Sequence, residues 1–328
     1  MLPNHTKLTG RGIAWITFVA YLAGFGCVPI AKSQSMSKKI DPEKIIIDTD
    51  IGDDIDDAFA LALALRSPEV QILGISTTFG DTETRARLVD RFLNETNREG
   101  IPVAVGIATG DSGLMTQRAY AESARFNKSS HSKAVDFISA EIRRYPGEVT
   151  LVAFGPLGNV GALIDSDRPT FKKLRRVVMM GGSIAKGYGD LGYAKLQGPE
   201  PEWNIKNDVA AARKLFASGV PIFMLPLDST QLKLDEVKRA YVFQAATPLT
   251  DALTLLYHQW GQQTPTLFDA MTIAFIVNPT LCPVTPMHIS VESNGMTRSV
   301  DGAPNAEVCL ESDPESFFRF YIPRVTAR

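Results

Sequence analysis

The sequence predicts an α/β fold with a mostly parallel, doubly wound (Rossmann-like) open sheet and helices on both of its faces. Apolar, β-type runs alternate with helical patterns along most of the chain, which is typical of strands joined by crossover helices. The runs are apolar at consecutive positions, as expected for strands buried on both faces. The 328 residues contain no internal repeat and no low-complexity linker. A single domain over residues 38–328 is therefore expected, with extra helices and short strands toward its C-terminal end.

The expected elements follow in an order that should bring their ends together. Strands are predicted at residues 44–50, 70–78, 102–106, 150–154, 176–180 and 222–227. Helices are predicted at residues 56–66, 82–95, 132–144, 159–164 and 209–217. From Leu234 the pattern is helical, and short β-type segments occur near residues 287–291 and 307–310. Because ligands of open α/β sheets bind at the carboxyl ends of strands, the polar residues and glycines at those ends should share one rim. They are Asp48, Asp50, Thr78, Gly80, Asp81, Gly155, Pro156, Gly181 and Gly182.

Residues 1–37 differ in composition from the rest of the chain. Lys7 and Arg11 precede an apolar run at residues 12–31, and a polar tract follows it. This is the pattern of a signal peptide, with a small-x-small cleavage sequence at residues 31–33. We therefore expect export to the periplasm or the exterior. A retained membrane anchor is the alternative, because the run approaches the roughly 20 residues that span a bilayer.

Charge and cysteine content restrict the partners. The formal net charge of -2 gives no electrostatic argument for binding nucleic acid or an anionic membrane surface. A membrane is expected as a partner only if the N-terminal segment is retained. In an exported chain Cys282 and Cys309 could form a disulfide, and two buried free thiols are the alternative.

Six aspartates fall within ten residues where the first strand gives way to the first helix, in KIIIDTDIGDDIDDAFALAL (residues 44–63). Carboxylates about 4 Å apart repel one another, more strongly where water is excluded, so the cluster needs a cation. Carboxylate oxygens suit a hard divalent ion such as calcium. The stretch has no histidine or cysteine, which argues against zinc.

Neither an EF-hand loop nor helix capping accounts for all of this stretch. An EF-hand loop has glycine at its sixth position and glutamate at its twelfth, whereas Gly52 would be fifth and Phe59 twelfth. Carboxylates are also favourable at helix N-termini, by about 0.3–1 kcal/mol. That effect explains the aspartates that begin the helix but not those on the strand side.

The segment DTDIGDDIDDA resembles the calcium-binding signature of the nucleoside hydrolases, often written DTDPGIDDA. Further segments agree with the family in order: TTFGD (77–81), GPLGN (155–159), MMGG (179–182), EWNIKND (202–208) and LFDA (267–270). The resemblance implies the nucleoside hydrolase fold and calcium-dependent hydrolysis of ribonucleosides to free base and ribose. It also implies a small-molecule nucleoside as substrate and assembly as a homodimer or homotetramer.

By position in these motifs, the resemblance implies roles in metal binding and catalysis for four residues. Asp50 would be both a calcium ligand and the general base for the attacking water. Asp57 would be a second carboxylate ligand, Gly158 would offer its backbone carbonyl, and Asp269 would complete the ligand set.

The same resemblance implies a set of sugar-binding residues. Asp56 would hold ribose hydroxyls, and Glu202 and Asn204 would bind the sugar with Trp203 beside them. Asp81 falls where the family commonly has a ribose-binding asparagine.

Three departures from the family pattern leave alternatives open. Two extra residues follow Gly52, so Asp53 or Asp54 could replace an assigned ligand. The loop at residues 183–201 is longer than in the short form, and the family's ribose asparagine has no clear counterpart in it. Phe268 stands where many purine-cleaving members have the histidine that protonates the leaving base.

Because of Phe268, the leaving-group acid must come from elsewhere in the chain. His131 is the expected donor, since a family loop histidine often lies there, and His258 is the alternative. The preferred base is left open.

Two other functions compete with this interpretation. The segment IIIDTDIGD resembles the strand end of aspartate-nucleophile phosphatases, but TTFGD, GPLGN and EWNIKND have no role in that mechanism. An exported nucleoside- or sugar-binding protein with lost turnover is the non-enzyme alternative, and Phe268 favours it. Release of free base from a nucleoside distinguishes a hydrolase from such a binding protein.

Overall fold

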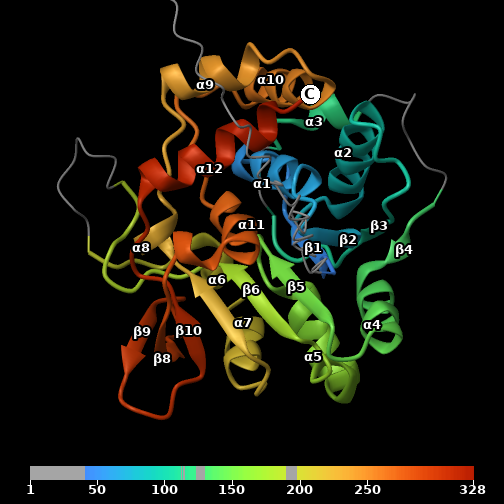
Figure 1. The fold of residues 1–328 in the computed structure, drawn as a ribbon. Helices are drawn as coiled ribbons and strands as arrows, with labels where there is room; N and C mark the ends of the chain where they lie inside the picture. Colours follow the sequence, from blue (N-terminus) through green and yellow to red (C-terminus); the bar gives the residue numbers. More distant parts are fainter. Residues whose placement is uncertain (1–40, 112, 114, 123–129, 190–197) are drawn as a thin grey trace, which may run out of the picture. The chain divides into compact units, whose positions relative to one another are not determined.

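The computed structural model describes residues 41–111, 113, 115–122, 130–189 and 198–328. The expected signal peptide or anchor at residues 1–37 lies outside these residues. Among the described helices, none is long and apolar enough to cross a membrane. Strands and helices alternate as predicted and confirm the α/β class (Figure 1).

The described strands form one mixed sheet in the order β4-β3-β2-β1-β5-β6-β7-β10-β8-β9. Neighbouring strands from β4 to β10 pair in parallel, whereas β8 pairs antiparallel with β10 and with β9. The strands are β1 (Glu43–Thr49), β2 (Val70–Thr77), β3 (Val103–Val105), β4 (Ser132–Lys133), β5 (Val149–Ala153), β6 (Arg176–Met180), β7 (Ile222–Leu225), β8 (Thr285–Val291), β9 (Thr297–Val300) and β10 (Ala306–Val308).

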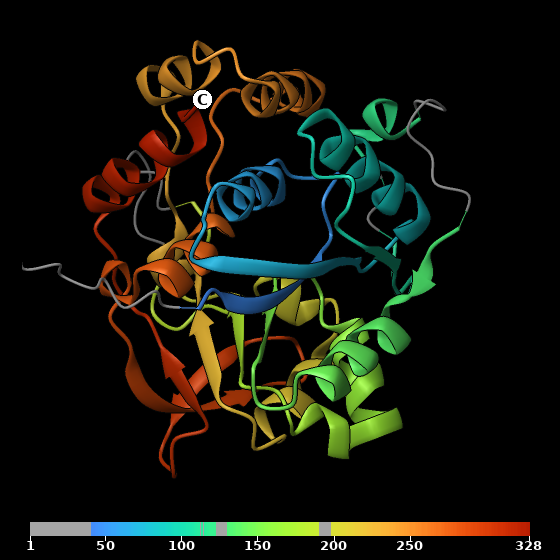
Figure 2. The same cartoon turned by 45° about the vertical axis from the view of Figure 1, so that its right-hand side comes forward.

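Helices cover both faces of this sheet, as Figure 2 shows from a second side. Their order along the chain confirms the doubly wound arrangement. The helices are α1 (Asp56–Leu65), α2 (Thr82–Glu95), α3 (Arg118–Ala121), α4 (Ala134–Arg144), α5 (Gly158–Phe171), α6 (Trp203–Lys206), α7 (Val209–Phe216), α8 (Leu227–Thr230), α9 (Glu236–Phe243), α10 (Pro248–Trp260), α11 (Ala270–Val277) and α12 (Pro314–Thr326), with the 3₁₀ turn η2 (Pro279–Leu281).

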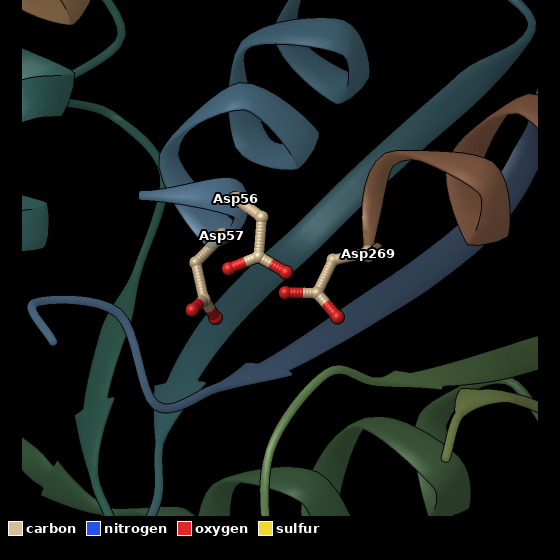
Figure 3. Close-up of side chains that lie close together, drawn as sticks. All are labelled: Asp56, Asp57 and Asp269. Atoms are coloured by element: carbon tan, nitrogen blue, oxygen red, sulfur yellow. The ribbon is translucent and has the colours of Figure 1, made fainter. Parts of the chain in front are cut away.

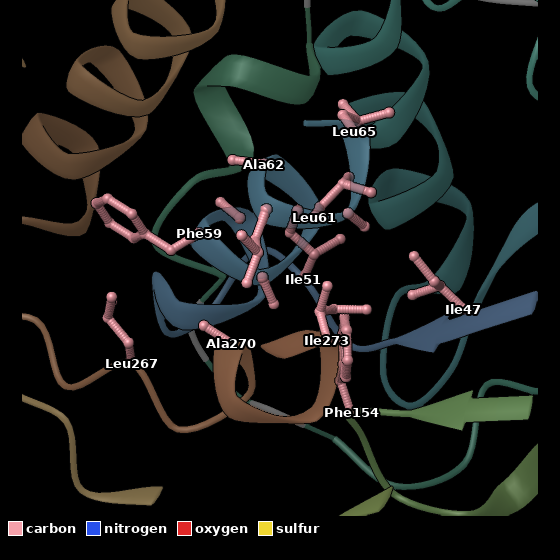
Figure 4. Packing of buried hydrophobic residues seen from close by; sticks show 14 of the residues in the cluster. Ile47, Ile51, Phe59, Leu61, Ala62, Leu65, Phe154, Leu267, Ala270 and Ile273 are labelled. Atoms are coloured by element: carbon pink, nitrogen blue, oxygen red, sulfur yellow. The ribbon is translucent and has the colours of Figure 1, made fainter. Parts of the chain in front are cut away.

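Strand β1 is central because consecutive apolar residues serve both layers. Ile45 and Ile47 pack into a core with α1, α2 and α10–α12 (Figure 4), and Ile46 packs into a second core with α4, α5 and α7. All three are fully buried, and burying such a side chain stabilises a fold by roughly 1.5–3 kcal/mol. Since β2 and β5 flank β1 on opposite sides, the chain reverses its direction of winding there, which is where open α/β sheets bind ligands.

The structure differs from the expected elements mainly where pattern signals are weak. The helix expected at residues 132–144 begins two residues later, because Ser132 and Lys133 pair with β3 as the short strand β4. Helix α5 extends to Phe171 across a kink at Asp167, two residues before Pro169. Cys282 and Cys309 form a disulfide that joins the end of η2 to the end of β10, which resolves the choice left open by the sequence.

Candidate active site and metal centre

A cavity of about 290 Å³ opens at the carboxyl ends of β1, β5 and β6, beside the point where the strand order reverses. Carboxylates make up much of its wall, and large apolar or aromatic side chains make up most of the rest. The lining residues are Asp50, Asp53, Asp54, Asp56, Asp57, Phe154, Met180, Tyr188, Glu202, Trp203, Asn204, Phe268 and Asp269.

Three of these carboxylates converge from two helix N-termini (Figure 3). Asp56 and Asp57 begin α1, and Asp269 immediately precedes α11. One oxygen from each lies within 4.8 Å of the other two, and all three side chains are buried. The Thr49 hydroxyl donates to Asp57 Oδ1.

The electrostatics of this trio favour a bound cation. Burial, together with the neighbouring carboxylates, raises the pKa of Asp56, Asp57 and Asp269 well above the ordinary value. Helix N-termini favour negative charge, but that effect does not offset the repulsion. The donors are all oxygens, as a hard cation such as calcium prefers. The residues present therefore fit a calcium ion, with Asp56 joining Asp57 and Asp269 in the group that offers it ligands.

Asp50 lies beside the trio at the end of β1. Burial raises its pKa to about 7, against the opposing effects of the Arg85 cation and a hydrogen bond from the Trp203 side chain. Asp50 is thus a carboxylate whose protonation changes near neutral pH, which suits a general base.

The two extra residues of the loop have partners of their own. Asp53 Oδ2 accepts from Arg85 Nη2 at 2.7 Å, and Asp54 Oδ1 accepts from the Ile55 backbone N–H at 2.7 Å. Both side chains line the cavity, but neither belongs to the group that could hold a metal.

The segment Glu202–Asn204 also lines the cavity. Glu202 caps α6 and accepts from the backbone N–H groups of Gly182 at 2.9 Å, Asn204 at 2.8 Å and Ile205 at 3.1 Å. The Asn204 side chain donates to the Phe154 carbonyl at 2.7 Å, so it ties α6 to the end of β5. Local folding therefore places all three predicted sugar-binding residues of this motif at the cavity.

Sequence reasoning missed Tyr188, which lies in the long loop after β6. Its hydroxyl donates toward Glu202 Oε1 at 3.3 Å and accepts from the Trp203 backbone N–H at 2.9 Å. Its ring packs edge-on against Phe268, with ring centroids 6.0 Å apart. Periodicity cannot find a loop residue of this kind; its aromatic character in a loop after a strand end was the only signal.

Two predicted site residues are held elsewhere by other partners. His131 Nε2 lies 2.7 Å from Asp90 Oδ2, and its side chain is only 6% exposed. It does not line the cavity, so its position does not support the expected role as leaving-group acid. Asp81 caps α2 and pairs with Arg118 at 2.9 Å, and it is likewise absent from the cavity wall.

Gly158, the expected carbonyl ligand, and His258, the alternative leaving-group acid, also do not line the cavity. Gly158 is already the first residue of α5 and lies near Thr109, so its carbonyl is directed along the helix. Phe154, at the end of β5, lines the cavity instead. His258 is exposed on α10.

Comparison with known proteins agrees with this geometry. The family model described as inosine-uridine preferring nucleoside hydrolase matches residues 45–319. Pyrimidine-specific ribonucleoside hydrolase RihA of Shigella boydii is 30% identical over 312 residues, which cover 83% of this chain and 95% of that protein. Uridine nucleosidase 1 of Arabidopsis thaliana is 30% identical over 279 residues, covering 77% of this chain and 80% of its own.

Solved structures share the fold. A plant nucleoside hydrolase, PpNRh1, matches with a TM-score of 0.77 and 25% identity, covering 88% of this chain and 100% of its own. A purine-preferring ribonucleoside hydrolase from Gardnerella vaginalis matches with a TM-score of 0.74 and 23% identity, covering 87% and 98%. The chain therefore belongs to the inosine-uridine preferring nucleoside hydrolase family, whose members are enzymes that cleave N-glycosidic bonds.

Proposed function

We propose that this chain hydrolyses the N-glycosidic bond of ribonucleosides in a calcium-dependent reaction and releases free base and ribose. The observation that carries the proposal is one cavity lined both by a group of carboxylates and by aromatic side chains. Carboxylates suit a sugar that gains positive charge, and aromatic side chains suit a flat, apolar base.

The choice of base rests on the relatives. Two curated relatives are named for pyrimidine ribonucleosides and for uridine, whereas a structural neighbour is named as purine-preferring. Uridine is therefore the first substrate to test, and inosine is the second.

The carboxylates that we assign to the metal are those of the trio, Asp56, Asp57 and Asp269, with Asp50 beside them. Calcium, when bound, would neutralise these charges and polarise water and sugar hydroxyls. Asp56 and Asn204 would hold the hydroxyls of a ribose, which would fix the anomeric carbon for attack. The surrounding carboxylates would stabilise positive charge that develops on the sugar ring.

Asp50 is our candidate for the general base. It would take a proton from the attacking water at its carboxylate, which has to be ionised to do so. Water that attacks opposite the leaving base would form the new C–O bond, break the N-glycosidic bond and invert the anomeric carbon, as in other glycosidases in which a carboxylate activates the water. The departing base would take up a proton from solvent, and the proton held by Asp50 would pass to solvent, which balances the reaction. Tyr188, Trp203 and Phe268, which line the same cavity, would pack on the base and exclude solvent.

We also propose that the chain is exported. The Cys282–Cys309 disulfide supports this, since structural disulfides persist mainly in oxidising compartments. The signal-like pattern of residues 1–37 supports it independently.

The test is release of uracil from uridine by the full chain, with excess calcium and with a chelator. We expect turnover with calcium that the chelator abolishes, and Asp50→Asn should lose about 1000-fold in kcat, in the middle of the range typical of general-base contributions. Uridine binding without release of uracil would contradict hydrolysis. It would favour a nucleoside-binding protein without turnover, the alternative that Phe268 favours because it stands in place of the family histidine. Near-normal kcat in Asp50→Asn would contradict the assignment of the base.

A further inference from the structure

Arg85, on α2, is a buried cation at the edge of the acidic loop, with a side chain that is only 1% exposed. Its guanidinium donates through Nε to the Phe79 carbonyl at 2.8 Å and through Nη1 to the Ile51 carbonyl at 2.9 Å. Nη1 also donates to the Asp50 carbonyl, and Nη2 donates to Asp53 Oδ2 at 2.7 Å. One side chain thus holds three backbone carbonyls and one carboxylate.

These contacts join the two loops that follow β1 and β2. Phe79 has a φ of 63°, an unfavourable conformation for a bulky residue, and its carbonyl is one of the groups that Arg85 holds. Gly52 has a φ of +125°, and a Cβ there would lie 2.3 Å from Met115 Cε and 3.5 Å from Arg85 Nη1. Both loops therefore follow a path that the surrounding contacts fix.

These contacts help to fix the position of Asp50. Arg85 holds its backbone carbonyl, while Gly155 leaves room for its carboxylate: a Cβ at Gly155 would lie 2.9 Å from Asp50 Oδ1. The two extra residues after Gly52 add Asp53, which completes the set of acceptors around the guanidinium. A lysine cannot reproduce this set, because its ammonium lacks the rigid, planar fork.

We propose that Arg85 is a positioning residue for Asp50, acting through the backbone of the acidic loop with Asp53 as its anchor. The inference rests on the proposed function, because it assigns Arg85 to the orientation of the general base. It predicts that the rate of the chemical step depends on Arg85 more than substrate binding does.

The test compares Arg85→Lys and Asp53→Asn with wild type for uridine hydrolysis. In Arg85→Lys we expect kcat to fall about 100-fold, the size of effect that a displacement of about 1 Å can produce, while KM changes little. Asp53→Asn leaves the carbonyl contacts in place, so its kcat should fall between the two. Calcium affinity and thermal unfolding are measured on every variant, so that loss of metal or of fold is separated from loss of positioning.

Arg176→Lys is the matched control. Arg176 is 13% exposed and pairs with Glu43 at 2.8 Å, at the opposite end of β1 from the cavity. This variant should lose some stability and keep wild-type kcat and KM.

Each result separates this inference from the proposed function. If wild type releases no base, the proposed function fails and the inference fails with it. If wild type is active and neither variant lowers kcat, or if kcat falls only in step with calcium affinity, the positioning role is refuted and the proposed function stands. If Arg85→Lys does not fold, Asp53→Asn decides: a lower kcat at unchanged calcium affinity supports the role, and an unchanged kcat refutes it.

Discussion

Glu202 and the trio Asp56, Asp57 and Asp269 are buried carboxylates that line the same cavity, and their partners differ. Glu202, on the α6 side, accepts from three backbone N–H groups. Asp56, Asp57 and Asp269, on the α1 and α11 side, lie close together and repel one another. Burial raises the pKa of Glu202, but backbone hydrogen bonds oppose it, whereas the pKa of each trio member lies well above its ordinary value.

The burial of a carboxylate therefore does not by itself identify a metal site. A carboxylate with backbone donors is satisfied by the protein and serves as a structural cap. Buried carboxylates that face one another are costly unless they are protonated or a cation joins them. The calcium site that we propose therefore consists of the trio and does not include Glu202.

The largest effect is expected when one carboxylate of the trio is replaced. Asp57→Asn should raise the calcium concentration needed for half-maximal uridine hydrolysis by more than about 100-fold, beyond the range typical of residues that only orient ligands. The lost charge weakens the attraction for the ion, and the measurement is activity against free calcium. Asp81→Asn is the control, since asparagine caps a helix as well as aspartate; an equal shift in both variants would contradict the assignment.

The second effect is a pH dependence that calcium removes. The folded-state pKa of Asp50, about 7, lies above the value of about 3.9 expected for an unfolded aspartate. Between these values the native state binds more protons than the unfolded state, so the stability of the calcium-free protein should fall as pH rises from about 4 to about 7. Thermal unfolding with a chelator at pH 5 and pH 8 measures this.

With excess calcium the same comparison should lose or reverse its trend, because calcium binds the ionised carboxylates. A calcium-free protein that is more stable at pH 8 than at pH 5 would show that the protein offsets the repulsion among the buried carboxylates without a cation.

The smallest effect lies on the Glu202 side. Glu202→Gln should destabilise the fold by about 2 kcal/mol, because an amide replaces a charged acceptor of backbone N–H groups. Its calcium affinity should stay close to that of wild type, as measured by calorimetry alongside thermal unfolding. A variant of normal stability that has lost calcium would place Glu202 in the metal site and erase the distinction between the two sides.

The fold could be predicted further than the site. The apolar runs of β1 and β6 and the amphipathic pattern of α2 report burial directly, so their positions followed from local sequence. The two-residue strand β4 carries no periodicity, and it forms only because β3 offers it an edge.

The metal site was partly predictable, because like charges at a strand end imply a cation whatever the loop geometry. The other features of the site depend on contacts between residues that are far apart in the sequence. His131 meets Asp90 on α2 and not the cavity, and the partners of Arg85 come from loops that follow two different strands. Tyr188 reaches the cavity from a loop without regular structure.

A calorimetric titration of calcium into the metal-stripped, folded protein at neutral pH tests most directly whether Asp56, Asp57 and Asp269 form a calcium site. We predict that each chain binds one calcium ion, and that binding is weakened in Asp57→Asn but not in Glu202→Gln. A well-folded wild-type protein that takes up no calcium would contradict it.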